Sequence, residues 1–173
     1  MVPTEAHCLD AALHLLDTGG PQAASIRRIA ALLSVPPTTV YTYFPDQAAV
    51  FHALTDRVLG EVYARVPTAR RTPWRQRVTA LALAGRSQLL AHPALVPLMV
   101  AGPLDGPCGT AMAQRLSELL GDAGLTGDDI VRGRQVIAAY IYGAVALEVG
   151  RSADAAQFSW GLERVLAGLS PAN

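Results

Sequence analysis

The sequence predicts an all-α fold of about nine helices. Apolar residues recur at the three- and four-residue spacing of helices along the whole chain, and no segment shows the two-residue alternation of a half-buried strand. Prolines and glycines fall between these periodic segments, where they end helices. Hydrophobic residues make up 51% of the 173 residues and charged residues 16%, a composition that builds a core and excludes low-complexity disorder.

The N-terminal part contains four predicted helices. Thr4, Ser25 and Asp46 are expected to cap the first, second and fourth of them, because their side-chain oxygens can accept from free backbone N–H groups. The Pro36-Pro37 pair separates the second helix from a very short third one, since proline cannot lie inside a helix. The predicted ranges are 4–18, 25–34, 38–44 and 46–66.

Five further helices are predicted after residue 66. Pro73 follows Thr72 at the first position of a helix, the Gly- and Pro-rich segment 101–109 is a loop, and Ser152 is expected to cap the last helix. The predicted ranges are 73–91, 94–100, 112–123, 126–149 and 152–169. We expect residues 1–62 to form a three-helix head with the fourth helix as a linker, and residues 63–173 to form a helical body.

Residues 136–149 are apolar almost all round. This stretch contains Glu148 and is shorter than the roughly 20 residues that span a bilayer, so it predicts a buried helix and no membrane partner. Such a helix in a chain of this length is typically buried against a partner subunit as well as its own core. We therefore expect Ala139, Gly143 and Ala146, which permit close approach, to face a partner subunit.

Residues 25–44 have the dimensions of a helix-turn-helix, in which the second helix enters the major groove of DNA. If Val40 and Phe44 pack inward at their four-residue spacing, the threonines and tyrosines between them project outward and offer hydroxyls and methyls to bases and phosphates. Pattern alone leaves a second interpretation open, an ordinary helical hairpin with half-buried tyrosines. These outward residues are Thr38, Thr39, Tyr41, Thr42 and Tyr43.

Residues 25–51, with the segment Val-Tyr-Thr-Tyr-Phe at 40–44, resemble the DNA-binding head of the TetR family of transcriptional repressors. Residues 11–20 also resemble the end of that family's first helix. The body is similar to the tetracycline-repressor branch at residues 72–75, 89–93 and 158–162. The resemblance therefore spans nearly the whole chain, with weaker motifs after residue 62. It implies a homodimer with a four-helix interface that also contains Phe158, Leu162, Val165 and Leu166 on the last helix.

The resemblance implies a set of DNA contacts in the head. These are Ser25, Arg27 and Arg28 at the start of the second helix, Thr38, Thr39, Tyr41, Thr42 and Tyr43 around the third, and Gln47 at the start of the fourth. The sequence departs from the family twice, because Gln47 stands where the family usually carries a lysine, and residues 1–7 hold Glu5 but no Arg or Lys. Fewer phosphate contacts should weaken DNA binding and flatten its salt dependence.

The resemblance also implies a small-molecule effector that lowers operator affinity by binding in the body. Residues of aromatic, thioether or acidic character there are candidates to line its pocket, although each alone is equally a core residue. They are Tyr63, Trp74, Leu98, Met99, Met112, Tyr140, Tyr142 and Glu148. They predict an apolar effector and, because no histidine lies around 98–99 or 140–142, not a metal-bound tetracycline. No cofactor is expected, and the role of Glu148 stays open between pocket and dimer interface.

The predicted function is a homodimeric repressor released from a palindromic operator by a small apolar effector. The alternative is a helical interaction module that has lost DNA binding, motivated by Gln47 and by the three Arg and six acids of residues 1–61. An enzyme is not expected, since the chain has no nucleophile elbow, phosphate-binding loop or paired metal motif.

Two further expectations concern metals and cellular location. His7, Asp10 and His14 share one helical face, but exposed polar residues need no metal to explain them. Without a signal-peptide pattern, and with only Cys8 and Cys108 as thiols, a cytoplasmic protein is expected.

Overall fold

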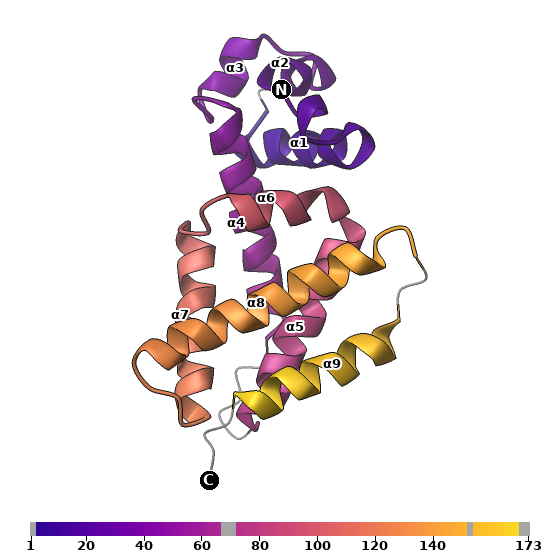
Figure 1. Ribbon diagram of the computed structural model, residues 1–173. Coiled ribbons are helices and arrows are strands. Elements are labelled where there is room, and N and C mark those ends of the chain that lie inside the picture. Colours follow the sequence, from indigo (N-terminus) through magenta and orange to yellow (C-terminus); the bar gives the residue numbers. More distant parts are fainter. Residues whose placement is uncertain (1–2, 67–71, 152–153, 170–173) are drawn as a thin grey trace.

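The computed structural model describes residues 3–66, 72–151 and 154–169, and within them it is all-α (Figure 1). Nine α-helices and two short 3₁₀ turns, but no strand, occur in these ranges, as the sequence predicts. No helix in these ranges is long and apolar enough to cross a membrane. The α-helices are α1 Glu5–Gly19, α2 Ile26–Leu32, α3 Pro37–Tyr41, α4 Gln47–Ala64, α5 Trp74–Ala91, α6 Val96–Ala101, α7 Pro107–Asp122, α8 Asp128–Glu148 and α9 Ala155–Gly168.

The head consists of α1, α2, α3 and the first half of α4 (Figure 1). The predicted caps at its longest helices are confirmed, because the Thr4 hydroxyl accepts from the His7 N–H and the Asp46 carboxylate accepts from the Ala49 N–H. The apolar face of each helix meets the others in one core. Its fully buried side chains include Leu16, Ile29, Val40 and Leu54.

The body is a helical bundle into which the second half of α4 descends from the head (Figure 1). Helix α8 crosses α5 and α7, α9 packs along α8 and α5, and α6 lies across the head side of the bundle. The core of the bundle contains Leu89, Leu119, Ile137 and Val145, all fully or almost fully buried.

Most helix starts lie within two residues of the predicted ones, whereas those of α7 and α9 differ by more. Helix α7 begins at Pro107, five residues before the predicted start, because proline fits the first turn and the Asp56 carboxylate accepts from two N–H groups there. Helix α5 begins at Trp74, with Pro73 at the cap. The cap of α9 is Asp154, whose carboxylate accepts from two backbone N–H groups, whereas the predicted cap, Ser152, lies outside the described residues.

The expected dimer face of α9 needs correction. Phe158, Leu162 and Leu166 are buried within the subunit's own core and Val165 is half-buried. Their stripe packs against α8 and α5, so Phe158, Leu162 and Leu166 have almost no exposed surface to offer a partner. The exposed face of α9 carries Trp160 instead, which is 55% exposed.

A buried ion pair joins α5 to the end of α8 and resolves the role of Glu148. The Arg86 Nη2 atom lies 2.6 Å from Glu148 Oε2, and the Arg86 Nε atom also donates to this carboxylate at 3.1 Å. Both side chains are more than four-fifths buried, and the guanidinium lies over the Phe158 ring. Glu148 therefore neutralises a buried cation inside the subunit.

Replacing Glu148 by alanine should destabilise the protein by about 3 kcal/mol, because Arg86 would keep a buried charge without a counterion. Urea denaturation followed by circular dichroism measures this change. The control is Glu163→Ala on the exposed side of α9, expected to stay within about 0.5 kcal/mol of the parent protein. Equal effects of the two substitutions would show that the pair contributes nothing.

Candidate functional site

A tight turn between α2 and α3 builds the helix-turn-helix. The Val35 N–H donates to the Ala30 carbonyl at 3.0 Å and the Ser34 N–H to the Ala31 carbonyl at 3.1 Å, the two bonds of a Schellman motif. Ser34 adopts a φ of 56°, the left-handed conformation that this motif requires. Pro37 then opens α3. The turn thereby fixes the direction of α3 relative to α2.

Helix α3 has one buried and one exposed face. Val40 is fully buried and Phe44, just beyond the helix, is 3% exposed, as their spacing predicts. On the other face Thr38 and Tyr41 are exposed, the tyrosine by 51%, and Thr39 is half-buried. A large exposed aromatic residue on a helix this short contributes little to the core, so this face is available for a partner.

Two arginines of α2 lie beside this face. Arg27 and Arg28 are both exposed, and neither makes a hydrogen bond or ion pair within the described residues. Ser25 occupies the cap position of α2, as predicted, but its hydroxyl makes no capping hydrogen bond. These three polar groups are therefore free to contact an external ligand such as a phosphate.

Three residues of the predicted DNA-binding set are engaged inside the head. The Tyr43 hydroxyl donates to the Pro3 carbonyl at 2.9 Å, and the Thr42 hydroxyl donates to the Thr39 carbonyl. The expectation for Gln47 is corrected, because its amide donates to the Pro21 carbonyl at 2.8 Å rather than projecting outward. That carbonyl also accepts from the Ala24 N–H at 3.3 Å in the turn after α1, so the Gln47 amide is its second donor.

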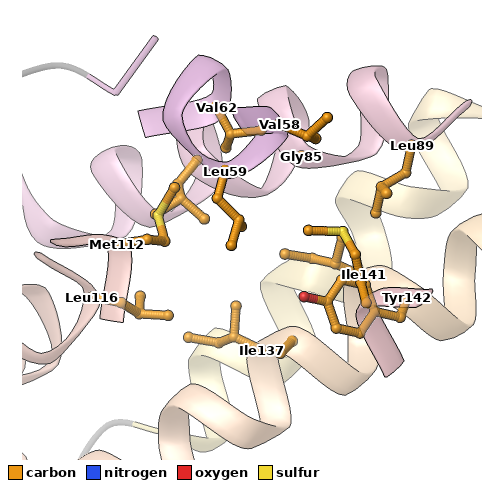
Figure 2. A pocket seen from close by; sticks show the side chains of 13 residues that line it. Val58, Leu59, Val62, Gly85, Leu89, Met112, Leu116, Ile137, Ile141 and Tyr142 are labelled. Atoms are coloured by element: carbon orange, nitrogen blue, oxygen red, sulfur yellow. The ribbon is translucent and has the colours of Figure 1, made fainter. Parts of the chain in front are cut away.

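A cavity of about 90 Å³ lies in the body between α4, α5, α6, α7 and α8 (Figure 2). Its wall is aliphatic except for two methionines and one tyrosine, and no charged side chain lines it. Such a wall favours an uncharged, apolar group over a polar one. The lining residues are Val58, Leu59, Val62, Leu81, Gly85, Leu89, Met99, Met112, Leu116, Ile137, Ala138, Ile141 and Tyr142.

Tyr142 supplies the polar group of the cavity wall, and Figure 2 shows its hydroxyl turned toward the other lining side chains. Burial raises the pKa of the Tyr142 hydroxyl, so it stays protonated at neutral pH. It has no hydrogen-bond partner within the described residues. The hydroxyl can therefore donate to or accept from a bound molecule.

The structure brings together three of the eight predicted pocket residues, Met99, Met112 and Tyr142. The others lie elsewhere: Leu98 faces a groove beside α4, Tyr63 is 41% exposed, Trp74 stands half-buried at the start of α5, and Tyr140 and Glu148 lie between α8 and α9.

The sequence reasoning missed the aliphatic lining residues, because aliphatic residues at helical spacing look like ordinary core. One signal was present. Gly85 lies midway between Leu81 and Leu89 on a single face of α5, and a glycine in an apolar stripe leaves space.

An unpartnered apolar strip runs along the outer face of α8. Ala139, Gly143 and Ala146 are exposed there, together with Leu147, which is 68% exposed. The exposed Trp160 lies on the adjacent helix α9. Monomeric proteins rarely leave such contiguous apolar surface uncovered, so this face fits contact with a second copy.

Helix α4 runs from the head into the wall of the cavity, and its Asp56 side chain binds the start of α7. This carboxylate accepts from the Gly109 N–H at 2.8 Å and the Cys108 N–H at 3.2 Å, at the start of α7. The two glycines at that point are required, since a Cβ at Gly106 would collide with Asp56 and one at Gly109 with the Leu104 carbonyl. Both α4 and α7 line the cavity, so a molecule bound there contacts two helices that Asp56 holds together.

Within the described residues, no three His, Cys, Asp or Glu side chains gather as a metal ion requires. The three residues considered for a metal have separate environments. His7 Nδ1 bonds to Thr4 at the helix cap, Asp10 pairs with Arg57 at 2.6 Å, and His14 is exposed.

A helix-turn-helix head on a helical body that encloses an apolar cavity defines a class of bacterial transcription regulators that respond to ligands. Residues 9–54 match the sequence family described as "Bacterial regulatory proteins, tetR family", and residues 66–159 match "Tetracyclin repressor-like, C-terminal domain". The chain belongs to the TetR family.

Individual relatives agree with this assignment. An HTH-type transcriptional regulator of Saccharopolyspora erythraea is 30% identical over 84% of this chain, and the transcriptional repressor DrrR1 of Streptomyces coeruleorubidus is 27% identical over 79%. The chain spans 61% and 50% of the length of these two relatives. Among solved structures, Streptomyces coelicolor ActR in complex with (S)-DNPA superposes with a TM-score of 0.85, 23% identity and 98% coverage of both chains.

Ser34→Gly should stabilise the protein by about 0.5–1 kcal/mol, because glycine adopts the left-handed conformation without the Cβ clash of serine. Thermal denaturation measures the change. Ser87→Gly is the matched control, since Ser87 is exposed within α5, where glycine costs about 0.5 kcal/mol. Destabilisation by both substitutions would contradict the strain assigned to Ser34.

Proposed function

We propose that this chain is a homodimeric repressor that binds a palindromic operator through its head and leaves it when a small apolar effector enters the cavity. Residues 1–62 would bind DNA, and residues 63–173 would bind the effector and the second subunit. The observation that carries the proposal is the connection of an exposed recognition surface to an uncharged cavity by one helix, α4. DrrR1 is named a repressor, and ActR was solved with a small molecule.

The DNA-binding part of the proposal rests on α2 and α3. The free guanidinium groups of Arg27 and Arg28 suit phosphates, while the exposed face of α3 suits the base edges of the major groove. Thr38, Thr39 and Tyr41 would then provide the sequence readout. With Gln47 engaged inside the head, phosphate contacts are few and binding should weaken only mildly with salt.

The dimeric part of the proposal rests on the outer face of α8. Small residues at Ala139, Gly143 and Ala146 allow two helices to approach closely, and Leu147 and Trp160 supply apolar area to be covered. A symmetric pair of heads reads two half-sites about one helical turn of DNA apart, which requires a palindromic operator.

The effector part of the proposal rests on the chemistry of the cavity. Its wall offers one hydroxyl, from Tyr142, and otherwise only aliphatic carbon and thioether sulfur. An apolar cavity of roughly 150 Å³ binds benzene, so this one, of about 90 Å³, would have to expand to take a whole aromatic ring. Met99 and Met112 lower the free-energy cost of enlarging the cavity, because their unbranched side chains change conformation readily.

The coupling between effector and DNA would run through α4. A ligand that enlarges the cavity displaces Val58 and Val62 in its wall, and the Asp56 contact makes α4 follow any movement of α7. The first turns of α4 belong to the head, so a change in the direction of α4 would also change the orientation of the head. Effector binding and operator binding then oppose each other reciprocally.

The experiment that tests the function is selection of random duplex DNA by the purified protein at low and moderate salt, followed by sequencing of the bound pool. An enriched palindrome supports the repressor and supplies its operator. No enrichment at either salt, with a folded dimer confirmed, would favour an interaction module that has lost DNA binding. The excess of acids over arginines in residues 1–61 is the observation behind that second candidate.

Tyr41→Ala and Thr39→Ala should each weaken binding to the selected operator by about 1–3 kcal/mol, because each removes a contact to the bases without touching the core. Fluorescence anisotropy of labelled operator measures the affinity. Tyr63→Ala is the matched control, as this tyrosine is similarly exposed but lies on the body end of α4. Unchanged affinity in both head variants would remove α3 from the recognition surface.

Gly85→Leu should fill the cavity and abolish ligand binding while leaving operator affinity intact. A Cβ at Gly85 meets only Ile141 Cγ2 at 3.8 Å, so a larger side chain enters the open space. The measurement is the rise in melting temperature caused by the neutral probe 4-phenylbutanamide. Gly121→Leu on the outer face of α7 is the control and should keep the rise, since its Cβ meets no atom. If the probe still raises the melting temperature of Gly85→Leu, it binds outside the cavity.

A further inference from the structure

A second hollow, the outer hollow, adjoins the apolar cavity, the inner cavity, on the side of α7 and α8. Its volume is about 270 Å³, and it is more open to solvent than the cavity. Five residues line both spaces and form the wall between them: Leu59, Met112, Leu116, Ala138 and Tyr142. Flexible side chains such as Met112 make this wall easy to displace. The two spaces can therefore join around one ligand.

The outer hollow contains an arginine without a counterion. Arg134 is the charged residue among its lining residues, and it is half-buried. Its Nη1 atom donates to the Ala113 carbonyl at 3.3 Å, but no carboxylate pairs with it within the described residues. The more deeply buried arginines differ, since Arg77 pairs with Asp122 and Arg86 with Glu148. A partly desolvated guanidinium lacking an acid favours an external anion.

The spacing along α8 connects this arginine to the cavity. Arg134, Ala138 and Tyr142 follow one another at four-residue intervals on one face of the helix, and all three line the outer hollow. Each interval advances about 6 Å along the helix axis. A molecule anchored at Arg134 thus reaches the wall at Ala138 after one helical turn and the Tyr142 hydroxyl after two.

We propose that the two hollows form one site for a small amphiphilic carboxylic acid. The carboxylate would pair with the Arg134 guanidinium, whose planar donors match its two oxygens, and the apolar part would pass Ala138 into the inner cavity. Arg134 is then the residue that selects acids over neutral compounds of the same shape. This proposal deepens the proposed function and rests on it, because it names the chemical class of the effector.

The test compares two probes of one shape, 4-phenylbutanoate and its neutral amide, 4-phenylbutanamide, by isothermal titration calorimetry without DNA. The parent protein should bind the acid about tenfold more tightly, equivalent to about 1.4 kcal/mol. Arg134→Gln should remove this preference and leave the affinity for the amide unchanged. Arg132→Gln is the matched control and should keep the preference, because Arg132 is exposed and pairs with Asp129. Equal affinities in the parent protein, or no binding of either probe, overturn the proposal.

A third variant guards against loss of folding in Arg134→Gln, which also removes the bond to the Ala113 carbonyl. Arg134→Lys retains the positive charge but loses the two parallel donors, so it should keep part of the preference for the acid. A preference lost equally in Arg134→Lys and Arg134→Gln would show that the charge is not what selects the ligand.

Operator release is measured separately, so that the two proposals can fail independently. Binding of the acid through Arg134 without release of the selected operator supports the site and contradicts its effector role. Release by acid and amide alike, unchanged in Arg134→Gln, supports the effector role of the cavity and overturns the selection of acids.

Discussion

The rest of the structure depends on the packing of α4 in two cores at once. Val50 and Leu54, near its start, are fully buried in the head, while Val58 and Val62, one and two turns further on, line the cavity of the body. Protein interiors are close-packed, so displacement of one end of a rigid helix cannot be absorbed locally. Any molecule that moves the cavity wall must therefore change the position of the head or cost packing energy.

Polar contacts on the other faces of α4 hold this arrangement. Arg57 pairs with Asp10 of α1 at 2.6 Å, and the hydrogen bond and charge of Asp10 raise the pKa of Arg57. On the body side Asp56 binds the start of α7. A second link bypasses α4, because His92 at the end of α5 lies 2.7 Å from Asp17 of α1. The head is thus attached to the body on two sides.

Features that depend on residues close together in the sequence could be predicted, and features that depend on contacts between residues far apart in the sequence could not. The Thr4 and Asp46 caps and the two faces of α3 depend on residues within one or two turns, and the structure confirms them. Gln47 was misassigned because its partner lies 26 residues away. Glu148 could not be assigned because Arg86 is 62 residues away. The apolar stripe of α9 was recognised, but spacing alone cannot distinguish a subunit's own core from a partner.

The cavity itself argues for a ligand rather than for imperfect packing. A space of about 90 Å³ that no apolar side chain occupies forfeits packing worth about 2 kcal/mol. Gly85 in its wall costs about 1 kcal/mol relative to alanine within a helix, although a Cβ there would meet only an ordinary contact with Ile141. The same site therefore carries two separate costs that one methyl group would reduce. A ligand that fills the space recovers the lost contacts, and that recovered energy is what is available to reorient α4.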